Sequence, residues 1–317
     1  MTETSTRTFN PPTTPQPHLD EGWNPKRLSL RLSKKHPKLA QRLIALERRR
    51  AEKTTGPGDL SDLLAPGQER AADFPAYYVA NPVHGMPGMH GMDPSMGQRQ
   101  EQMEEDFPMA SRAQIQWWVQ TWVKDQGIEP RRILDVGSGT GAGALVFADL
   151  FPEAEIIGVD ISPAMLRWAK KRAARQGVEN VAFYHMDAGR LDYFEDNSFD
   201  LVLEAHILHE MPTYQNERVV SEMVRLCKPG GMLGFWDWAI PENEKDWKHR
   251  EVMVRVNAEP FMLQFAKYNF PERLREWGCT DVQRTDRHSQ SARWLAFKGE
   301  NTNELIAPDL ARIRATY

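Results

Sequence analysis

The stretch LDVGSGTGA, residues 134–142, decides the fold class of this chain. It continues the apolar run RRILDV (131–136), which is typical of a buried strand, and it opens an apolar segment with the character of a helix. Gly137, Gly139 and Gly141 allow the backbone to turn tightly and a ligand to approach it closely. Such a turn predicts a nucleoside-binding α/β domain, but the glycines alone do not separate a nicotinamide enzyme from other nucleoside binders.

Strands and helices alternate on the C-terminal side of this turn. Ser162 and Pro163 are a typical helix start directly after the second strand. Because strands separated by helices pair in parallel, we expect a parallel sheet. Near the end of the chain two strands follow each other without a helix between them, which predicts an antiparallel edge. The strands expected after the first are 154–160, 181–187, 199–205, 231–237, 279–287 and 292–299.

The composition limits the class of protein and its partners. The chain has 317 residues, 40% hydrophobic and 26% charged, with a formal net charge of −4. This charge gives no general reason to expect nucleic acid or an anionic membrane as a partner. Two cysteines, Cys227 and Cys279, exclude a disulfide-rich scaffold and a thiolate zinc site, so we expect no metal. No apolar run approaches the roughly 20 residues that span a bilayer, and we expect a cytoplasmic location.

Three aspartates at predicted strand ends give the glycine turn a more specific meaning. Asp160 ends the second strand and suits a ribose. Asp135, directly before the glycines, would repel a pyrophosphate but can engage an ammonium group. Asp187 ends the third strand, where a carboxylate can accept a hydrogen bond from an adenine amino group. With the turn LCKPGGML (226–233), this order of motifs resembles the class I S-adenosylmethionine-dependent methyltransferases.

The resemblance is to the small-molecule group that includes the ubiquinone and menaquinone methylases, the methyltransferase type 11 group. It covers about residues 107–298, and it is strong over 133–233. It implies an α/β fold with a Rossmann-like, seven-stranded, mostly parallel sheet whose last strand is antiparallel, and S-adenosylmethionine as cofactor. The cofactor-binding residues that the resemblance implies are Asp135, Gly137, Ser138, Gly139, Gly141, Asp160, Ile161, Met165, Asp187, Ala188 and Glu204.

The domain organisation follows from this placement. Residues 1–25, rich in Pro and Thr, are expected to be disordered. Residues 26–106 form an N-terminal extension with a basic helix, whose charges are expected to be a solvated face rather than a nucleic-acid site. Residues 107–298 form the methyltransferase domain, with a helical insert at 240–270 that builds an acceptor pocket, and 299–317 form a C-terminal tail. A homodimer is compatible with this organisation.

Histidines and aromatic residues near the predicted active end of the sheet are candidates for the methyl acceptor's site. In EAHILHEM, His206 and His209 are candidate general bases. We favour His206 as substrate-facing, because the resemblance suggests a structural or cofactor-pocket role for His209. A structural role for either remains the simpler alternative. Aromatic residues at helical spacing more often form a core than a pocket. The expected substrate-binding residues are Tyr77, Tyr78, His90, Trp236, Phe261 and Phe265.

The stretch HGMPGMHGMDPSMG, residues 84–97, precedes the domain and holds four methionines, four glycines and His84 and His90. We expect an active-site lid, with the glycines as hinges, the methionines as an adaptable apolar surface and His84 as a further candidate base. The alternatives are a loop without a specific role and a copper site.

The sequence therefore favours a methyltransferase that acts on a small, aromatic or apolar acceptor. Two alternatives share its features. One is a Rossmann-type NAD(P)-dependent oxidoreductase, against which Asp135 argues. The other is a protein that binds S-adenosylmethionine without transferring its methyl group. A nucleic-acid acceptor is not expected, since the chain lacks an Asn-Pro-Pro-Tyr-type base-flipping signature.

Overall fold

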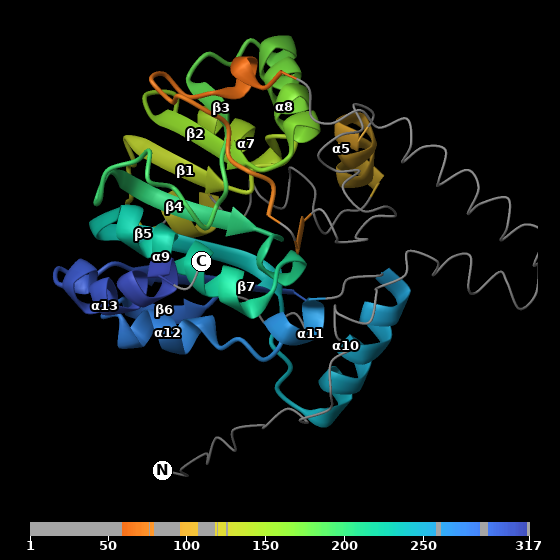
Figure 1. The fold of residues 1–317 in the computed structure, drawn as a ribbon, viewed down its shortest axis with the longest axis vertical. Helices are drawn as coiled ribbons and strands as arrows, with labels where there is room; N and C mark the ends of the chain where they lie inside the picture. Colours follow the sequence, from red (N-terminus) through yellow and green to blue (C-terminus); the bar gives the residue numbers. More distant parts are fainter. Residues whose placement is uncertain are drawn as a thin grey trace, which may run out of the picture.

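A computed structural model describes residues 59–75, 77–78, 96–106, 118, 120–124, 126–257, 261–285 and 291–315. In this part of the chain, seven strands form one sheet in the order β3-β2-β1-β4-β5-β7-β6 (Figure 1). Strands β1 to β5 are parallel to one another, and β7 is antiparallel to both β5 and β6. The predicted α/β fold with an antiparallel last strand is confirmed. The strands are β1 (Arg132–Val136), β2 (Glu155–Asp160), β3 (Val181–His185), β4 (Phe199–Ala205), β5 (Cys227–Trp238), β6 (Thr280–Arg284) and β7 (Ser291–Phe297).

The position of the antiparallel strand differs from the expected edge. Strand β7 lies inside the sheet, between β5 and β6, and β6 forms the edge. The sequences of the two strands explain this order. The residues of β7, SARWLAF, are mostly buried, whereas TDVQR in β6 is mostly exposed. An apolar strand gains from a place that is covered on both faces, and a polar strand tolerates the edge.

Helices cover both faces of the sheet. Helices α7 (Ala142–Leu150) and α8 (Pro163–Gln176) pack on one face. Helices α9 (Thr213–Leu226), α12 (Phe270–Glu276) and α13 (Thr302–Ala315) pack on the other. The residues expected to form a C-terminal tail are thus largely a helix, α13, which lies against α9 (Figure 1).

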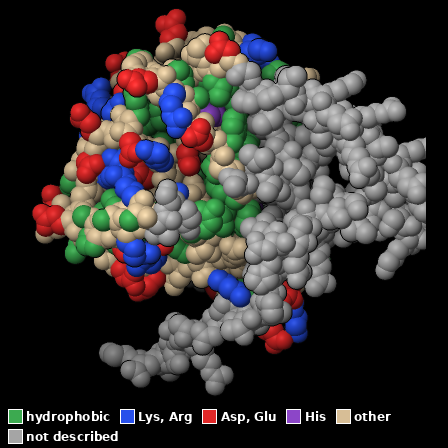
Figure 2. Space-filling view, viewed as in Figure 1, with side chains coloured by type: hydrophobic (Ala, Val, Ile, Leu, Met, Phe, Trp, Pro, Cys, Tyr) green, Lys and Arg blue, Asp and Glu red, His purple; other side chains and the backbone are tan. Residues whose placement is uncertain are grey.

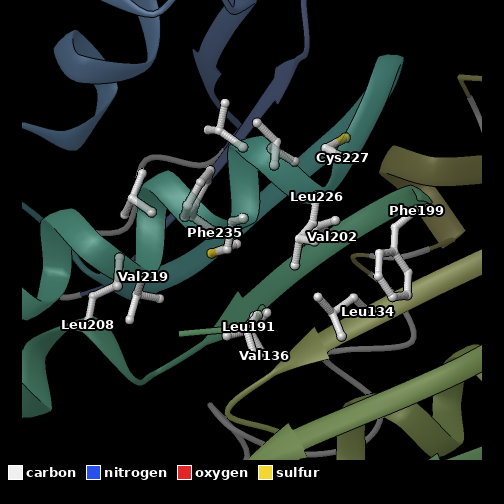
Figure 3. Packing of buried hydrophobic residues seen from close by; sticks show 14 of the residues in the cluster. Leu134, Val136, Leu191, Phe199, Val202, Leu208, Val219, Leu226, Cys227 and Phe235 are labelled. Carbon is white, nitrogen blue, oxygen red and sulfur yellow. The ribbon is translucent and has the colours of Figure 1, made fainter. Parts of the chain in front are cut away.

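Alternation along the strands divides the apolar residues between these two layers. In β1, Ile133 joins the core under α7 and α8, whereas Leu134 joins the core under α9. Figure 3 shows this second core, where Val202 and Phe235 of the sheet meet Val219 of α9. Since both faces are buried, the central strands read as continuous apolar runs in the sequence.

Most of the remaining described elements lie at the carboxyl ends of the strands or along the β3 edge. They are η2 (Ser61–Leu63), α5 (Met96–Asp106), η6 (Leu208–Glu210), α10 (Glu244–Asn257) and α11 (Met262–Phe265). The short helix η5 (Gln120–Lys124) instead packs into the core under α7 and α8 through Val123. Helices α10 and α11 form the predicted insert after the fifth strand. The basic helix expected in the N-terminal extension lies outside the described residues.

The visible described surface carries acidic and basic side chains side by side rather than a field of one sign (Figure 2). This agrees with the small net charge. Among the described helices, none combines the length and the apolar character that crossing a membrane requires.

Candidate active site

The order in which strands are added to the sheet reverses at β1. Strands β2 and β3 lie on one side of β1, and β4 pairs with β1 on the other side. Open α/β sheets bind ligands at the carboxyl ends of the strands beside such a point. The glycine turn after β1 lies there, and hydrogen bonds fix its shape. The backbone N–H groups of Gly137 and Ser138 both donate to the carbonyl of Val159, at 2.8 and 3.0 Å, so the turn is tied to β2.

Asp160, at the end of β2, holds two backbone groups at once. Its carboxylate accepts the N–H of Gly139 at 2.8 Å and the N–H of Ser162 at 2.7 Å. Burial raises the pKa of Asp160 to about 6, and the hydrogen bonds from Ser162 and Gly139 limit that rise. The side chain that was expected to bind ribose therefore also positions the glycine turn and the start of α8.

The glycines of the turn differ in what surrounds them. A Cβ at Gly139 would meet no atom within 4 Å among the described residues, although the backbone has a φ of +50°. A Cβ at Gly141 would lie 2.7 Å from the ring of Phe183, and one at Gly137 would lie 2.4 Å from Ile207. Gly137 and Gly141 are thus required by packing. Gly139 borders open space, as expected for a residue that a cofactor approaches.

Two buried carboxyl groups lie at the ends of the neighbouring strands β1 and β4. Asp135 is 3% exposed and Glu204 is fully buried. Oδ2 of Asp135 and Oε1 of Glu204 have no hydrogen-bond partner among the described residues. Burial raises the pKa of Asp135 to about 7 and that of Glu204 well above its usual range. A buried carboxyl group with one unpaired oxygen fits a ligand that brings a positive charge, as the ammonium and sulfonium groups of S-adenosylmethionine do.

Asp187 follows β3 and is also oriented by the chain. Its Oδ1 accepts the N–H of Gly189 at 2.9 Å and Nε2 of Gln215, on α9, at 2.8 Å. Burial raises the pKa of Asp187, and the bond from Gly189 opposes that rise. Gln215 was not among the predicted site residues, because its hydrogen bond to Asp187 joins segments that are 28 residues apart in the sequence.

Other residues expected at the cofactor site lie around these carboxylates. The carbonyl of Ile161 lies 2.9 Å from Nε2 of His185. Ser138 is buried in the turn, Ala188 packs against the core under α9, and Met165 in α8 is buried against Met96 of α5. The structure thus gathers the predicted set at one end of the sheet, and the binding role of each residue stays a prediction.

The two histidines after β4 have different surroundings. Nδ1 of His209 lies 2.6 Å from Oδ1 of Asp237 at the end of β5, and both side chains are buried. His206 has a φ of +62°, which is uncommon for a residue with a side chain, and its ring lies 5.2 Å from that of Trp236. Asp237 was not among the predicted site residues. An acidic residue inside the aromatic run FWDW was the signal that could have indicated it.

The aromatic candidates lie in packed surroundings. Trp236, Phe261 and Phe265 are at most 1% exposed. Tyr77 is partly buried, with its ring edge-on to Phe261 at 6.1 Å. Tyr78 lies near Asp160, and burial, followed by that carboxylate, raises the pKa of Tyr78 well above its usual range. Contact of these side chains with an acceptor stays a prediction.

The candidates His84 and His90, with most of the predicted lid, lie outside the described residues. The segment after the lid, helix α5, is held beside the glycine turn by an ion-pair cluster that the sequence did not reveal. Glu104 accepts hydrogen bonds from Thr140 of the turn at 2.5 Å and from Arg172 of α8 at 2.8 Å. Glu101 accepts from Nε1 of Trp168 at 2.7 Å. The cluster connects the N-terminal extension directly to the cofactor end of the domain.

Comparisons with known proteins agree with this site. Residues 133–231 match the methyltransferase domain family. The demethylmenaquinone methyltransferase of Thermus thermophilus is 39% identical over 112 residues, which are 35% of this chain and 49% of that protein. The enzyme of the same name from Listeria monocytogenes is 33% identical over 135 residues, 42% of this chain and 55% of that one. The chain therefore spans about half the length of these curated relatives.

A solved arsenic(III) S-adenosylmethionine methyltransferase from Chlamydomonas reinhardtii is 27% identical, covering 53% of this chain and 64% of its own, with a TM-score of 0.41. In the glycine turn and in the family match, residues 133–231 are similar to methyltransferase domains of the class I, S-adenosylmethionine-dependent kind. The particular resemblance, to the menaquinone-methylase type, is confirmed over this part of the chain.

Proposed function

We propose that this protein transfers the methyl group of S-adenosylmethionine to a small, apolar, hydroxylated ring of the quinol type. The observation that carries the transferase part is the ordered set of carboxylates around the glycine turn. Asp135, Asp160 and Asp187 lie at or just beyond the carboxyl ends of three adjacent strands, and each is already oriented by a backbone N–H group. This arrangement is preorganised, so little side-chain ordering is needed when the cofactor binds.

Each carboxylate has a proposed partner on the cofactor. Asp160 takes both ribose hydroxyls, and Asp187 with Ala188 takes the adenine edge, against which Ile161 packs. Asp135 and the glycine turn hold the amino acid part, and Glu204 lies beside the sulfonium. Bound there, S-adenosylmethionine supplies a methyl group on positively charged sulfur, which a nucleophile displaces directly. The chain contributes alignment of the nucleophile and exclusion of water.

The proposed acceptor class rests on two kinds of support. The curated relatives are named for methylation of demethylmenaquinone, a quinone. Aromatic side chains also gather at the insert, where Tyr77 contacts Phe261 and the ring of Trp238 lies 6.1 Å from that of His209. Apolar walls with few polar groups suit a ring molecule better than a charged acceptor.

The methionine-rich lid is part of the same proposal. Tyr78, which precedes the lid, and Met96, near the end of the lid, lie at the cofactor end of the domain, beside Asp160 and Met165. Methionines adapt their shape to apolar ligands. Replacing Met86, Met89 and Met92 by serine is expected to raise the KM for the acceptor, and unchanged kinetics would count against the lid.

The experiment that tests the function is label transfer. The purified full chain is incubated with methyl-labelled S-adenosylmethionine and a reduced, short-tailed demethylmenaquinone analogue. We expect labelled product with wild type and much less with Asp160→Asn. Cofactor binding without transfer to any ring acceptor would instead support a binding protein, and binding of NAD(H) in place of S-adenosylhomocysteine would support the oxidoreductase alternative.

A further inference from the structure

The carboxylate of Asp237 accepts four hydrogen bonds, three from the turn after β4 and one from Trp238 of β5. Oδ1 accepts from Nδ1 of His209 at 2.6 Å and from the N–H of Trp238 at 2.5 Å. Oδ2 accepts the N–H of Leu208 at 2.9 Å and that of His209 at 3.2 Å. The side chains of His209 and Asp237 are 5% and 2% exposed. The position of the imidazole is therefore fixed by β5, which lies beside β4 in the sheet.

This geometry determines which ring nitrogen carries the proton. Burial alone would raise the pKa of Asp237, but the charge and hydrogen bond of His209 outweigh it and lower the pKa overall. An ionised Asp237 only accepts hydrogen bonds, so Nδ1 of His209 is the donor. The basic nitrogen is then Nε2, and the carboxylate stabilises the imidazolium that forms when Nε2 takes a proton.

The other ionisable groups around His209 and Asp237 are poorer proton acceptors than His209. Burial lowers the pKa of His206 to about 4, although Asp237 opposes that shift, so this ring stays neutral and is a weak base. For Glu204 on β4, burial and then Asp237 raise the pKa, which favours the protonated form of this carboxyl group. The charged groups that also face the histidines are Glu210 of η6, Arg293 of β7 and Arg250 of α10, the last over the ring of Trp238.

A metal site is the competing interpretation of the same side chains. One ligand atom from each of His206, His209 and Asp237 lies within 4.8 Å of the others. Each oxygen of Asp237, however, already accepts two N–H groups, and a cation would have to displace at least one of them. A carboxylate in this state serves better to orient a histidine than to bind an ion.

We propose that Nε2 of His209 accepts the proton of the acceptor's hydroxyl group, with Asp237 as its positioning residue. This inference rests on the proposed function. In the step, the oxygen of the acceptor, or the ring carbon activated by loss of the hydroxyl proton, forms a bond to the methyl carbon. Where the carbon attacks, its ring proton is afterwards lost to water and the oxygen regains a proton, which restores the aromatic ring. The methyl–sulfur bond breaks, and its electron pair stays on sulfur. The hydroxyl proton moves to Nε2 and later leaves to water, so no oxidant, reductant or metal is required.

The first test compares two acceptors on the same ring scaffold. One has a phenolic hydroxyl with a pKa near 10; the other is a nitro-substituted analogue that is ionised at the assay pH. For the phenol, His209→Gln should lower kcat about 100- to 10,000-fold. For the ionised analogue, the loss should stay within a few-fold, because no proton has to be removed.

The pH profile and a control variant separate a proton acceptor from a structural residue. With the phenol, wild type should lose kcat toward acid pH, and Asp237→Asn should weaken or abolish this dependence. The matched control is His249→Gln, which changes an exposed histidine on α10 and should leave both acceptors unaffected. Binding of S-adenosylhomocysteine by the variants reports whether the fold is intact. Equal losses with both acceptors would overturn the proposal, as would activity that disappears on removal of divalent metal.

A second measurement needs no acceptor, so it stands even if the proposed function fails. With ¹⁵N-labelled histidine, NMR of the full chain should show His209, assigned by its disappearance in His209→Gln, protonated on Nδ1 and basic on Nε2. Asp237→Asn should change that state. A neutral His209 protonated on Nε2 would overturn the proposal whatever the acceptor is. Failure of wild type to methylate either ring, with the NMR result as expected, would instead contradict the proposed function.

Discussion

Oδ2 of Asp160 lies 2.8 Å from the backbone nitrogen of Gly139, so one carboxylate at the end of β2 both holds the glycine turn after β1 and lies in the place expected for a ribose. The N–H of Ser162 occupies the other oxygen at 2.7 Å. Loss of the negative charge of Asp160 should therefore weaken cofactor binding in two ways, by removing a contact with the ribose and by loosening the glycine turn.

We expect Asp160→Asn to weaken binding of S-adenosylhomocysteine at least tenfold. A hydrogen bond to a charged acceptor contributes about 1.5–3 kcal/mol, and two ribose hydroxyls are involved. Isothermal titration calorimetry of the full chain measures the effect. Asp149→Asn, at an exposed position on α7, is the matched control and should bind as wild type does. Unchanged affinity in Asp160→Asn would remove Asp160 from the cofactor site.

Two glycine variants should separate binding from folding. Gly139→Ala places a methyl group in open space, so its cost in stability is limited to the positive φ, about 1–2 kcal/mol. It should nevertheless weaken cofactor binding at least tenfold. Gly141→Ala adds a clash with Phe183 at 2.7 Å and should lower the free energy of unfolding further, by about 1–3 kcal/mol. Denaturant unfolding and calorimetry measure both. If Gly139→Ala binds normally, the turn does not face the cofactor.

Cofactor affinity should depend on pH between about 8 and 5. The pKa values of Asp135 and Asp160, about 7 and about 6, lie above the usual value for aspartate. Both groups must be ionised to bind the cofactor, so affinity should fall as pH decreases, roughly tenfold per pH unit below each pKa. Binding should also release protons, which calorimetry in buffers of different ionisation enthalpy detects. Asp160→Asn should show a weaker dependence, and a flat profile in wild type would contradict the assignment.

Without cofactor, Asp135 and Asp160 should make the folded chain less stable as pH rises, whereas cofactor affinity should increase with pH. Their pKa values are higher in the folded chain than in the unfolded chain, so the folded chain binds more protons between about pH 4 and pH 7. Their contribution to stability is fully present below about pH 4 and is lost as pH rises to the folded-state pKa values, about 6 for Asp160 and about 7 for Asp135. The difference in unfolding free energy between wild type and Asp160→Asn should therefore shift in favour of the variant as pH rises from about 4 to about 6, and should change little above that. A difference independent of pH would show that Asp160 is not perturbed.

The docking of helix α5 on the domain should depend on the buried side chain of Arg172. Its guanidinium donates to Glu104 at 2.8 Å, and both side chains are largely buried. Removing one partner of a buried pair typically costs about 3–5 kcal/mol, so Arg172→Met should increase hydrogen exchange in α5 and weaken its docking. Arg70→Met, which removes an exposed pair with Asp73, should have almost no effect. Equal exchange in the two variants would contradict the role of the cluster.

The sequence was sufficient for the parts of the fold that local patterns encode. The apolar runs, the glycine turn and the Ser162–Pro163 helix start are signals within a few residues, and the strands and helices follow them. The capping bond is observed, since Oγ of Ser162 accepts the N–H of Met165 at 3.3 Å. Aspartates at strand ends are similarly local, because parallel strands bring their carboxyl ends to one edge.

Side-chain contacts between segments that are far apart in the sequence could not be predicted from such local patterns. His209 and Asp237 are 28 residues apart, and Glu104 and Arg172 are 68 apart. Each pair depends on how two elements pack, which no periodicity encodes. The preference for His206 as the substrate-facing histidine came from the resemblance, and it stays a prediction. The carboxylate that orients His209 becomes visible only when β5 lies beside β4.

The most direct test of the central claim is the fate of a labelled methyl group. The full chain, methyl-labelled S-adenosylmethionine and a reduced demethylmenaquinone analogue are combined, and the products are separated and analysed by mass spectrometry. We predict a ring product heavier by one labelled methyl group, formed with release of S-adenosylhomocysteine in equal amount. Release of S-adenosylhomocysteine without labelled ring, or no turnover while the cofactor binds, would contradict the account.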